Sequence, residues 1–317
     1  MSDVRYTEIG VEDEGQRLDN YLMRILKGVP KSHIYRIIRA GEVRINKKRA
    51  QASSRLIHGD CVRIPPVRTA QDKEVFVGTK LEQRLRESII FEDNNLLVIN
   101  KPAGIAVHGG SGLSLGVIEA LRKTRNDLPY LELVHRLDKE TSGCLLLAKK
   151  RSMLRSIHAL LEAREVNKTY WALLYQPWQG KKTVVVDMPL EKNSLKSGER
   201  IVTVNKEGRA SQTVFKLLEN YQQACWVEAS PKTGRTHQIR VHSAYLGHAI
   251  VGDQKYSKAE PIEGLESKSR LYLHARAIQF NLNGNDYLFE ANLDEQFAKT
   301  LKRLGLLTSD FAKQKLS

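Results

Sequence analysis

The chain of 317 residues has few cysteines and no long apolar run, and both shortages exclude whole classes of protein. Its three cysteines, Cys61, Cys144 and Cys225, are far apart and form no C-x-x-C pair. This odd number and wide spacing argue against a disulfide framework and against a structural zinc site. No apolar stretch approaches the roughly 20 residues that span a bilayer, and residues 1–15 contain no signal-peptide core. We therefore expect a cytoplasmic protein with no membrane association.

Motifs for metals and nucleotide cofactors are also missing. Residues 108–112 are rich in glycine but match neither the G-x-x-x-x-G-K-[ST] loop nor the G-x-G-x-x-G turn. The histidines are dispersed, and His237 and His242 do not have the i, i+4 spacing of a zinc-binding helix. The H-x-E and P-C-x-x-C signature of zinc nucleobase deaminases is absent. The sequence predicts no metal site and no nucleotide cofactor.

Acidic residues are the scarcer charge, with 36 Asp and Glu against 51 Lys and Arg, so the net charge is +15. The excess is concentrated in residues 17–64, which hold twelve basic and three acidic residues, whereas residues 1–16 carry a net charge of −4. Such a basic segment favours a polyphosphate partner, because each neutralised phosphate releases condensed counterions. The alternative is a surface that only confers solubility.

Residues 17–64 also have the pattern of a small helix–strand module. Apolar residues recur at helical spacing from Leu18 to Leu26, and Ser32 is placed to cap a second helix that ends at Gly41. Alternation over residues 43–46 and 61–64 predicts two strands. A chain of this length exceeds the usual single core, so we expect a separate, larger domain after it.

This module resembles the alpha-L (S4-like) RNA-binding domain first described in a ribosomal small-subunit protein. Residues 17–19, 32–41 and 43–46 carry the resemblance. It implies that RNA phosphates are contacted by five basic residues: Lys31, Arg36, Arg39, Arg44 and Lys47. An acidic protein surface is the less plausible partner. We accordingly divide the chain into an N-terminal arm (1–16), in which residues 4–9 have the pattern of an edge strand, the alpha-L domain (17–64), a flexible linker (65–84) and a larger domain (85–317).

The larger domain is predicted to be α+β, with a mixed, largely antiparallel sheet and flanking helices. A hairpin is expected over residues 89–100, and a last hairpin begins near residue 271. The remaining predicted strands are residues 168–174, 182–186, 201–205, 211–218 and 224–229. Helices are predicted over residues 115–123, 153–164 and 297–306, with another after a turn at Gly234.

Asp138 lies on a loop before the short apolar run 144–148, which predicts a buried strand. A lone loop aspartate is usually a turn former or a helix cap. Two features favour a functional role: Arg136 comes two residues earlier, and a second basic stretch follows at residues 231–242. On the helix expected there, His237 and Arg240 share roughly one face.

These residues suggest chemistry with one carboxylate. Glu140 is two residues from Asp138 and would point elsewhere, so a glycosidase-like pair is weakly supported. A buried aspartate stays ionised only beside a charge partner, and Arg240 is the partner we expect. Tyr170 offers a planar face suited to stacking on a base. Arg136 could fill a gap left in a nucleic acid.

Four ordered motifs then resemble the pseudouridine synthases that modify ribosomal RNA: residues 100–104, 135–143, 168–170 and 234–242. The resemblance implies that Asp138 is the essential carboxylate, which attacks a flipped uridine or removes a sugar proton. Arg240 would orient Asp138. Tyr170 would stack on the uracil and accept the proton from carbon 5, while Arg136 fills the space of the flipped base.

The resemblance also implies the substrate and partners. A base that is already unpaired costs less free energy to extrude. This favours loops or incompletely assembled regions of 23S RNA, the large-subunit ribosomal RNA, as the substrate. Isomerisation needs no cofactor, and we expect a monomer. Two alternatives remain: a non-catalytic RNA-binding assembly factor that uses the same basic surface, and a hydrolase that releases free uracil.

Overall fold

The computed structural model describes residues 4–26, 28–67, 77–109, 115–194, 200–260, 262 and 270–314. The chain divides into two compact units, of which the first comprises residues 1–76 with the short segment 150–152 and the second comprises the rest. Among the described residues, no helix has both the length and the apolarity needed to cross a membrane.

The first unit packs two helices on a small antiparallel sheet. Its elements are β1 (Arg5–Glu8), η1 (Val11–Asp13), α1 (Leu18–Ile25), α2 (Lys31–Arg39), β2 (Arg44–Ile45), β3 (Lys48–Arg49) and β4 (Cys61–Ile64), with strand order β1-β4-β2-β3. Leu18 and Leu22 from α1 and Ile34, Ile37 and Ile38 from α2 are buried together. These are the apolar residues that recur at helical spacing in the sequence. Because they face the core, the basic residues of both helices lie on the opposite, solvent-facing side.

The edge strand predicted over residues 4–9 is present as β1, and it makes the N-terminal segment part of this unit instead of a separate arm over residues 1–16. β1 pairs along its whole length with β4, and Ile9 is fully buried in the core. β4 pairs with β2 on one edge, and β1 supplies hydrogen-bond partners for the backbone groups of β4 on its other edge. The acidic segment therefore forms an outer strand of the sheet. A smaller correction concerns Ser32: α2 begins at Lys31 with Pro30 as its N-cap residue, so Ser32 is not the cap.

The second unit is built on a ten-stranded sheet. The sheet contains β5 (Ile89–Glu92), β6 (Leu96–Lys101), β7 (Glu132–Leu133), β8 (Ser142–Ala148), β9 (Asn167–Tyr175), β10 (Thr183–Asp187), β13 (Gln212–Asn220), β14 (Ala224–Pro231), β15 (Leu273–Leu282) and β16 (Asn285–Glu290). The order is β10-β13-β14-β9-β15-β8-β6-β5, with β16 on β15 and β7 on β8. β8 and β15 run parallel and the other neighbours antiparallel. The α+β prediction is therefore confirmed.

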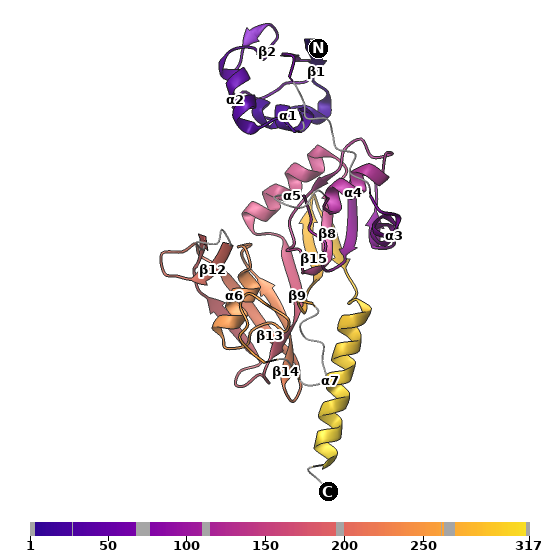
Figure 1. Ribbon diagram of the computed structural model, residues 1–317, viewed down its shortest axis with the longest axis vertical. Helices are drawn as coiled ribbons and strands as arrows, with labels where there is room; N and C mark the ends of the chain where they lie inside the picture. The colour runs from indigo at the N-terminus through magenta and orange to yellow at the C-terminus, as the bar shows by residue number, and fades with distance from the viewer. Residues whose placement is uncertain are drawn as a thin grey trace. The chain divides into compact units, whose positions relative to one another are not determined.

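The described residues of the second unit contain five helices (Figure 1), of which α5 begins within the segment 150–152: α3 (Thr79–Glu87), α4 (Val117–Thr124), α5 (Arg151–Ala163), α6 (Gln238–Tyr245) and α7 (Glu295–Gln314). Two apolar clusters form its core, one around β6 and β8 and the other around β9 and β14. Leu85 of α3 is buried in the first cluster, so this helix is not linker. The flexible linker predicted over residues 65–84 is therefore too long at its C-terminal end.

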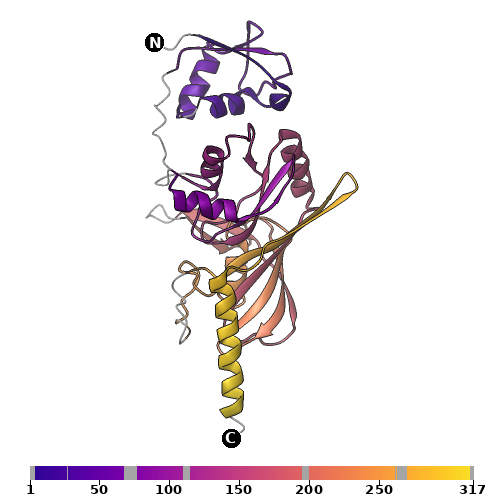
Figure 2. The ribbon, with the colours of Figure 1, turned by 90° about the vertical axis from the view of Figure 1, so that its right-hand side faces the viewer.

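Two further differences concern the end of the chain and one hairpin. α7 is longer than the predicted helix over residues 297–306, and Figures 1 and 2 show it extending away from the sheet. The predicted strand at residues 201–205 is β12 (Arg200–Val204), which pairs with β11 (Leu190–Ser194) in a separate two-stranded sheet. This hairpin packs on α6 through a small cluster that contains Leu190, Val202 and Val241.

Candidate active site

Asp138 lies on the loop that joins β7 to β8, at the edge of the first apolar cluster. All seven residues of β8 are buried, and Thr141 closes the loop by donating its N–H to the carbonyl of Asp138 at 3.1 Å. Gly143 then enters the sheet with a φ of +110°. A Cβ at this position would lie 2.3 Å from the carbonyl oxygen of Ala275 on β15. Glycine is therefore required where the loop that carries Asp138 meets the parallel strand.

A buried lysine holds the backbone next to Asp138. The Lys101 side chain is fully buried, and its ammonium group donates to the carbonyls of Pro102 (2.9 Å), Ile105 (2.8 Å) and Lys139 (3.0 Å). The backbone N–H of Gly104 donates to the same Lys139 carbonyl at 3.0 Å. The pKa of Lys101 is lowered overall, because burial lowers it by more than the charges of Glu140 and Asp138 raise it. The motif at residues 100–104 thus acts as a support for the loop.

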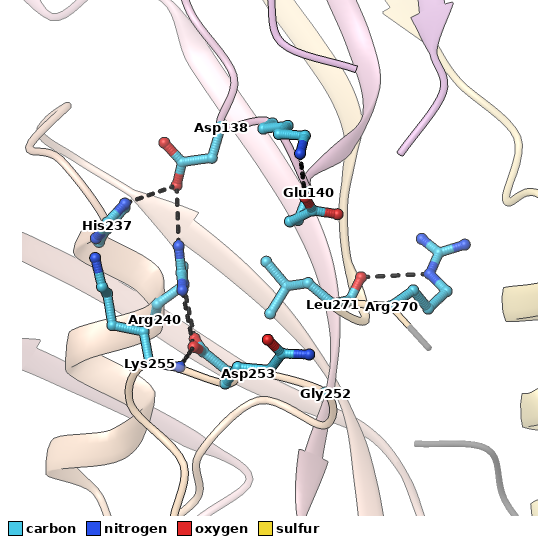
Figure 3. Close-up of a pocket in the computed structure, with 11 residues that line it drawn as sticks. Asp138, Glu140, His237, Arg240, Gly252, Asp253, Lys255, Arg270 and Leu271 are labelled. Atoms are coloured by element: carbon cyan, nitrogen blue, oxygen red, sulfur yellow. Dashed lines mark hydrogen bonds and ion pairs between the residues drawn. The ribbon is translucent and has the colours of Figure 1, made fainter. Parts of the chain in front are cut away.

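Asp138 faces two side chains from the start of α6 (Figure 3). Its Oδ2 lies 3.7 Å from Nε2 of His237 and 3.7 Å from Nη1 of Arg240. The predicted shared face of His237 and Arg240 is therefore present, although His237 is the N-cap residue and adopts a left-handed φ of +53°. Asp138 keeps about a third of its side chain exposed, so its carboxylate remains accessible to a substrate.

Arg240 has a second and closer partner, which the sequence reasoning missed. Its Nε and Nη2 donate to the two carboxylate oxygens of Asp253 at 2.7 and 2.8 Å, as Figure 3 shows. The Asp253 side chain is fully buried and also accepts the backbone N–H groups of Lys255 and Tyr256. The arginine and these N–H groups lower the pKa of Asp253 against the opposing effect of burial. Asp253 therefore fixes Arg240, which leaves Nη1 directed at Asp138.

His237 is fixed in a similar way by a tyrosine. The Nδ1 atom of His237 is 2.7 Å from the hydroxyl of Tyr256, which also accepts the backbone N–H of Val202 at 3.1 Å. Because that N–H occupies one side of the hydroxyl oxygen, we assign the hydroxyl proton to a bond with Nδ1. Burial lowers the pKa of His237 by more than the charge of Asp138 raises it, and Arg240 adds to the lowering, so the ring is neutral at neutral pH. Its Nε2–H then points toward Asp138.

Tyr170 projects from β9 into a cleft of about 580 Å³ that is also lined by Arg136, Asp138, His237 and Arg240. Burial, and then the charge of Asp138, raise the pKa of the Tyr170 phenol, so it is protonated at neutral pH. Arg136 is exposed on the same loop as Asp138. The structure thus brings together the four residues expected from the sequence of the larger domain.

A second hollow, of about 610 Å³, adjoins the cleft on the other side of Asp138 and includes Lys139, Glu140, Asp253 and Arg270. Glu140 is paired with the ammonium of Lys139 at 3.7 Å and lines this hollow together with Asp138. In the described part of the chain, no group of three potential metal ligands is assembled.

The basic residues predicted for the alpha-L domain all belong to the first unit and are exposed: Lys31, Arg36, Arg39, Arg44 and Lys47. Arg44 donates to the carbonyls of Gly41 and Lys47, which stiffens the β2–β3 turn without neutralising its charge. None of the five forms an ion pair with a described carboxylate, so their charges are available to an anionic partner.

Lys101, Asp253 and Tyr256 are the functional residues that the sequence reasoning did not assign. Lys101 lies inside a recognised motif, so its position was a usable signal. Asp253 and Tyr256 follow α6 in a stretch with no repeat or motif, and their roles become visible only when that stretch folds back onto Arg240 and His237.

Comparison with known proteins agrees with this geometry. The sequence profile described as RNA pseudouridylate synthase matches residues 95–245, and the S4 domain profile matches residues 16–62. The chain is 50% identical over 307 residues to ribosomal large subunit pseudouridine synthase C of Yersinia pestis, covering 95% of this chain and 96% of that protein. It is 51% identical over 307 residues to the protein of the same name from Pasteurella multocida, covering 95% of this chain and 94% of that protein.

A solved structure gives the same result for the fold. Human RNA pseudouridylate synthase domain containing 4 superposes with a TM-score of 0.60 and 30% sequence identity, covering 71% of this chain and 95% of that chain. The family resemblance read from the four motifs is therefore confirmed. With an arginine-flanked aspartate, a tyrosine in the same cleft and this identity along almost its whole length, the chain belongs to the RNA pseudouridylate synthase family.

Proposed function

We propose that this chain converts uridine to pseudouridine in large-subunit (23S) ribosomal RNA. The observation that carries the proposal is the placement of Asp138 and Tyr170 in one cleft, with Arg240 held at 3.7 Å from the carboxylate. The names of the bacterial relatives support the choice of large-subunit RNA. The cleft of about 580 Å³ falls within the range of small-ligand sites, so an extruded nucleoside is a suitable occupant.

The reaction breaks the bond between N1 of uracil and C1′ of the ribose and joins carbon 5 to the same C1′. One proton leaves carbon 5 and one is gained at N1, so the reaction consumes no cosubstrate and needs no redox cofactor. Asp138 supplies the ionised oxygen that attacks the nucleoside or removes a sugar proton. Arg240 and the neutral His237 face that oxygen and stabilise its charge.

The tyrosine and the loop arginine have separate roles in this proposal. Tyr170 presents its ring to the uracil, and stacking of this kind stabilises a base by about 1–3 kcal/mol. After the glycosidic bond has reformed, the protonated Tyr170 hydroxyl accepts the proton of carbon 5 as it releases its own proton to solvent. Arg136 lies exposed beside Asp138 and fills the space that the flipped base leaves in the RNA.

We propose that the first unit holds the RNA through its five exposed basic residues, and that the enzyme acts as a monomer in the cytoplasm. The residues that we assign to the reaction, Arg136, Asp138, Tyr170 and Arg240, line one cleft of one chain, which supports a monomer. Ribosomal RNA is cytoplasmic in the bacterial relatives, and the substrate thereby sets the location. Light scattering after gel filtration should give a mass near 36.0 kDa for an active sample.

The central experiment compares the wild type with Asp138→Asn on unmodified 23S RNA. Asparagine keeps the shape of the side chain but removes the ionised oxygen, so we expect no pseudouridine by carbodiimide mapping while RNA affinity stays within about twofold. Pseudouridine formed by the variant at the wild-type rate would overturn the proposal. Free uracil in the wild-type reaction would indicate a hydrolase, and an inactive wild type that still binds RNA would indicate an assembly factor.

A further inference from the structure

Lys168 is a half-buried cation without an anionic partner. It lies on β9 two residues before Tyr170, and because side chains alternate along a strand, both project from the same face. In the described part of the chain, no carboxylate or hydrogen-bond acceptor is paired with its ammonium group. Burial lowers the pKa of Lys168, and no neighbouring charge acts in the other direction.

The side chains around Lys168 are mostly basic. A third hollow, of about 250 Å³, continues from the Tyr170 cleft and shares Lys168, Gly234 and Arg235 with it. Arg164 and Lys232 also line this hollow, whereas Glu162 is its one carboxylate and forms no ion pair with Lys168. The basic side chains therefore outnumber the acidic one by four to one.

His135 and Gly234 define the position of the ammonium group more closely. His135 faces the charge of Lys168, and burial together with that charge lowers its pKa to about 4. The ring is therefore neutral, as required for Nε2 to accept the backbone N–H of Leu146 at 3.2 Å. On the other side, a Cβ built on Gly234 would lie 3.7 Å from Nζ of Lys168. The lysine thus lies between the catalytic loop and the turn that leads into α6.

An unpaired charge at such a place destabilises the fold, because removing a cation from water without a partner is costly. A residue of this kind is consistent with a site that is completed by an anionic ligand. The ligand that reaches this cleft under the proposed function is a single strand of RNA with one phosphodiester per nucleotide. The third hollow begins beside the uracil-stacking tyrosine, where the strand that flanks an extruded uridine must continue.

We propose that Lys168 binds the phosphodiester next to the extruded uridine and that the hollow lined by Arg164, Lys232 and Arg235 holds the continuing RNA strand. Lys168 is then a substrate-binding residue placed beside Tyr170, distinct from the exposed cations of the first unit. This inference rests on the proposed function, since it deepens the choice of substrate for the same cleft.

The test is Lys168→Met in the Asp138→Asn background, so that RNA binding is measured without turnover. Fluorescence anisotropy with a single-stranded, uridine-containing RNA is recorded between 50 mM and 300 mM salt. We expect the affinity to fall about 3- to 10-fold and the slope of log K against log salt to become shallower by about 0.7, the value for one phosphate contact on a single strand. Lys216→Met, which removes an exposed cation of β13 outside these hollows, should leave both quantities unchanged.

Stability provides a second readout that separates binding from structure. Because methionine keeps the length of the side chain and removes the unpaired charge, Lys168→Met should raise the urea midpoint of unfolding. A lower midpoint with an unchanged salt slope would mean that Lys168 is structural, and an unchanged affinity and slope would also overturn the inference. If the wild-type enzyme made no pseudouridine while the Lys168→Met effect on binding remained, the proposed function would fail and the anion site would stand.

Discussion

Replacing Lys101 by methionine tests whether the catalytic loop is held in place by the buried ammonium group. Methionine has a similar shape but no donor, so the carbonyls of Pro102 and Ile105 lose their partner. The Lys139 carbonyl keeps the N–H of Gly104 at 3.0 Å. The substitution therefore weakens the support for the loop without emptying the core.

The expected size follows from these contacts. A buried carbonyl left without a donor costs about 1–3 kcal/mol, so two of them cost about 2–6 kcal/mol. Part of this loss is offset because a desolvated cation is removed. We expect the free energy of unfolding to fall by about 2–3 kcal/mol. The rate should fall about 10- to 100-fold, since a shift of the order of 1 Å in a catalytic group has that effect.

Two measurements check the prediction. Urea unfolding followed by circular dichroism gives the stability, and single-turnover pseudouridine formation gives the rate. Lys139→Ala is the matched control for stability, because Lys101 contacts only the backbone carbonyl of Lys139 and alanine keeps that carbonyl. A Lys101→Met protein with wild-type stability and wild-type rate would refute the assignment of Lys101 as the support of the loop.

Three other perturbations have clear expectations. Asp253→Asn removes the counter-charge of Arg240, and we expect a loss of about 3 kcal/mol in urea unfolding and a rate at least about 10-fold lower. Gly143→Ala places a Cβ 2.3 Å from backbone, so thermal scans should show a large fall in Tm or no folded protein. Burial lowers the pKa of His135 and of His274 to about 4. Since the unfolded chain binds their protons near pH 6.5, unfolding titrations should show stability falling between pH 6.5 and 4, by up to about 3 kcal/mol per histidine.

The sequence predicted the helices and strands whose apolar residues recur with a clear period. It also predicted those site residues whose side-chain type permits only a few chemical roles. The buried strand at residues 144–148 was identifiable because five consecutive apolar residues are bounded by glycine and lysine. Arg240 was identifiable as the partner of Asp138 because an ionised carboxylate needs a cation. The resemblance of four motifs supplied the remaining roles in the cleft.

What the sequence did not predict depends on long-range folding. Asp253 is linked to Arg240 by a chain reversal after α6 that no local pattern announces. The pattern of residues 4–9 indicated an edge strand, but no local feature identified the distant strand β4 as its partner. Lys168 lies inside the motif at residues 168–170, but its lack of an anionic partner becomes visible only when the neighbouring elements are in place.

The bond from Val202 to Tyr256 has a consequence for how the β11–β12 hairpin tolerates mutation. The hairpin reaches the active site through a main-chain N–H, since Val202 donates to the hydroxyl that fixes the His237 ring. Every amino acid except proline carries that donor. Substitutions at residue 202 are therefore limited by how the new side chain fills the space beside Leu190 and Val241. They leave the backbone donor, and with it the orientation of the His237 imidazole, unchanged.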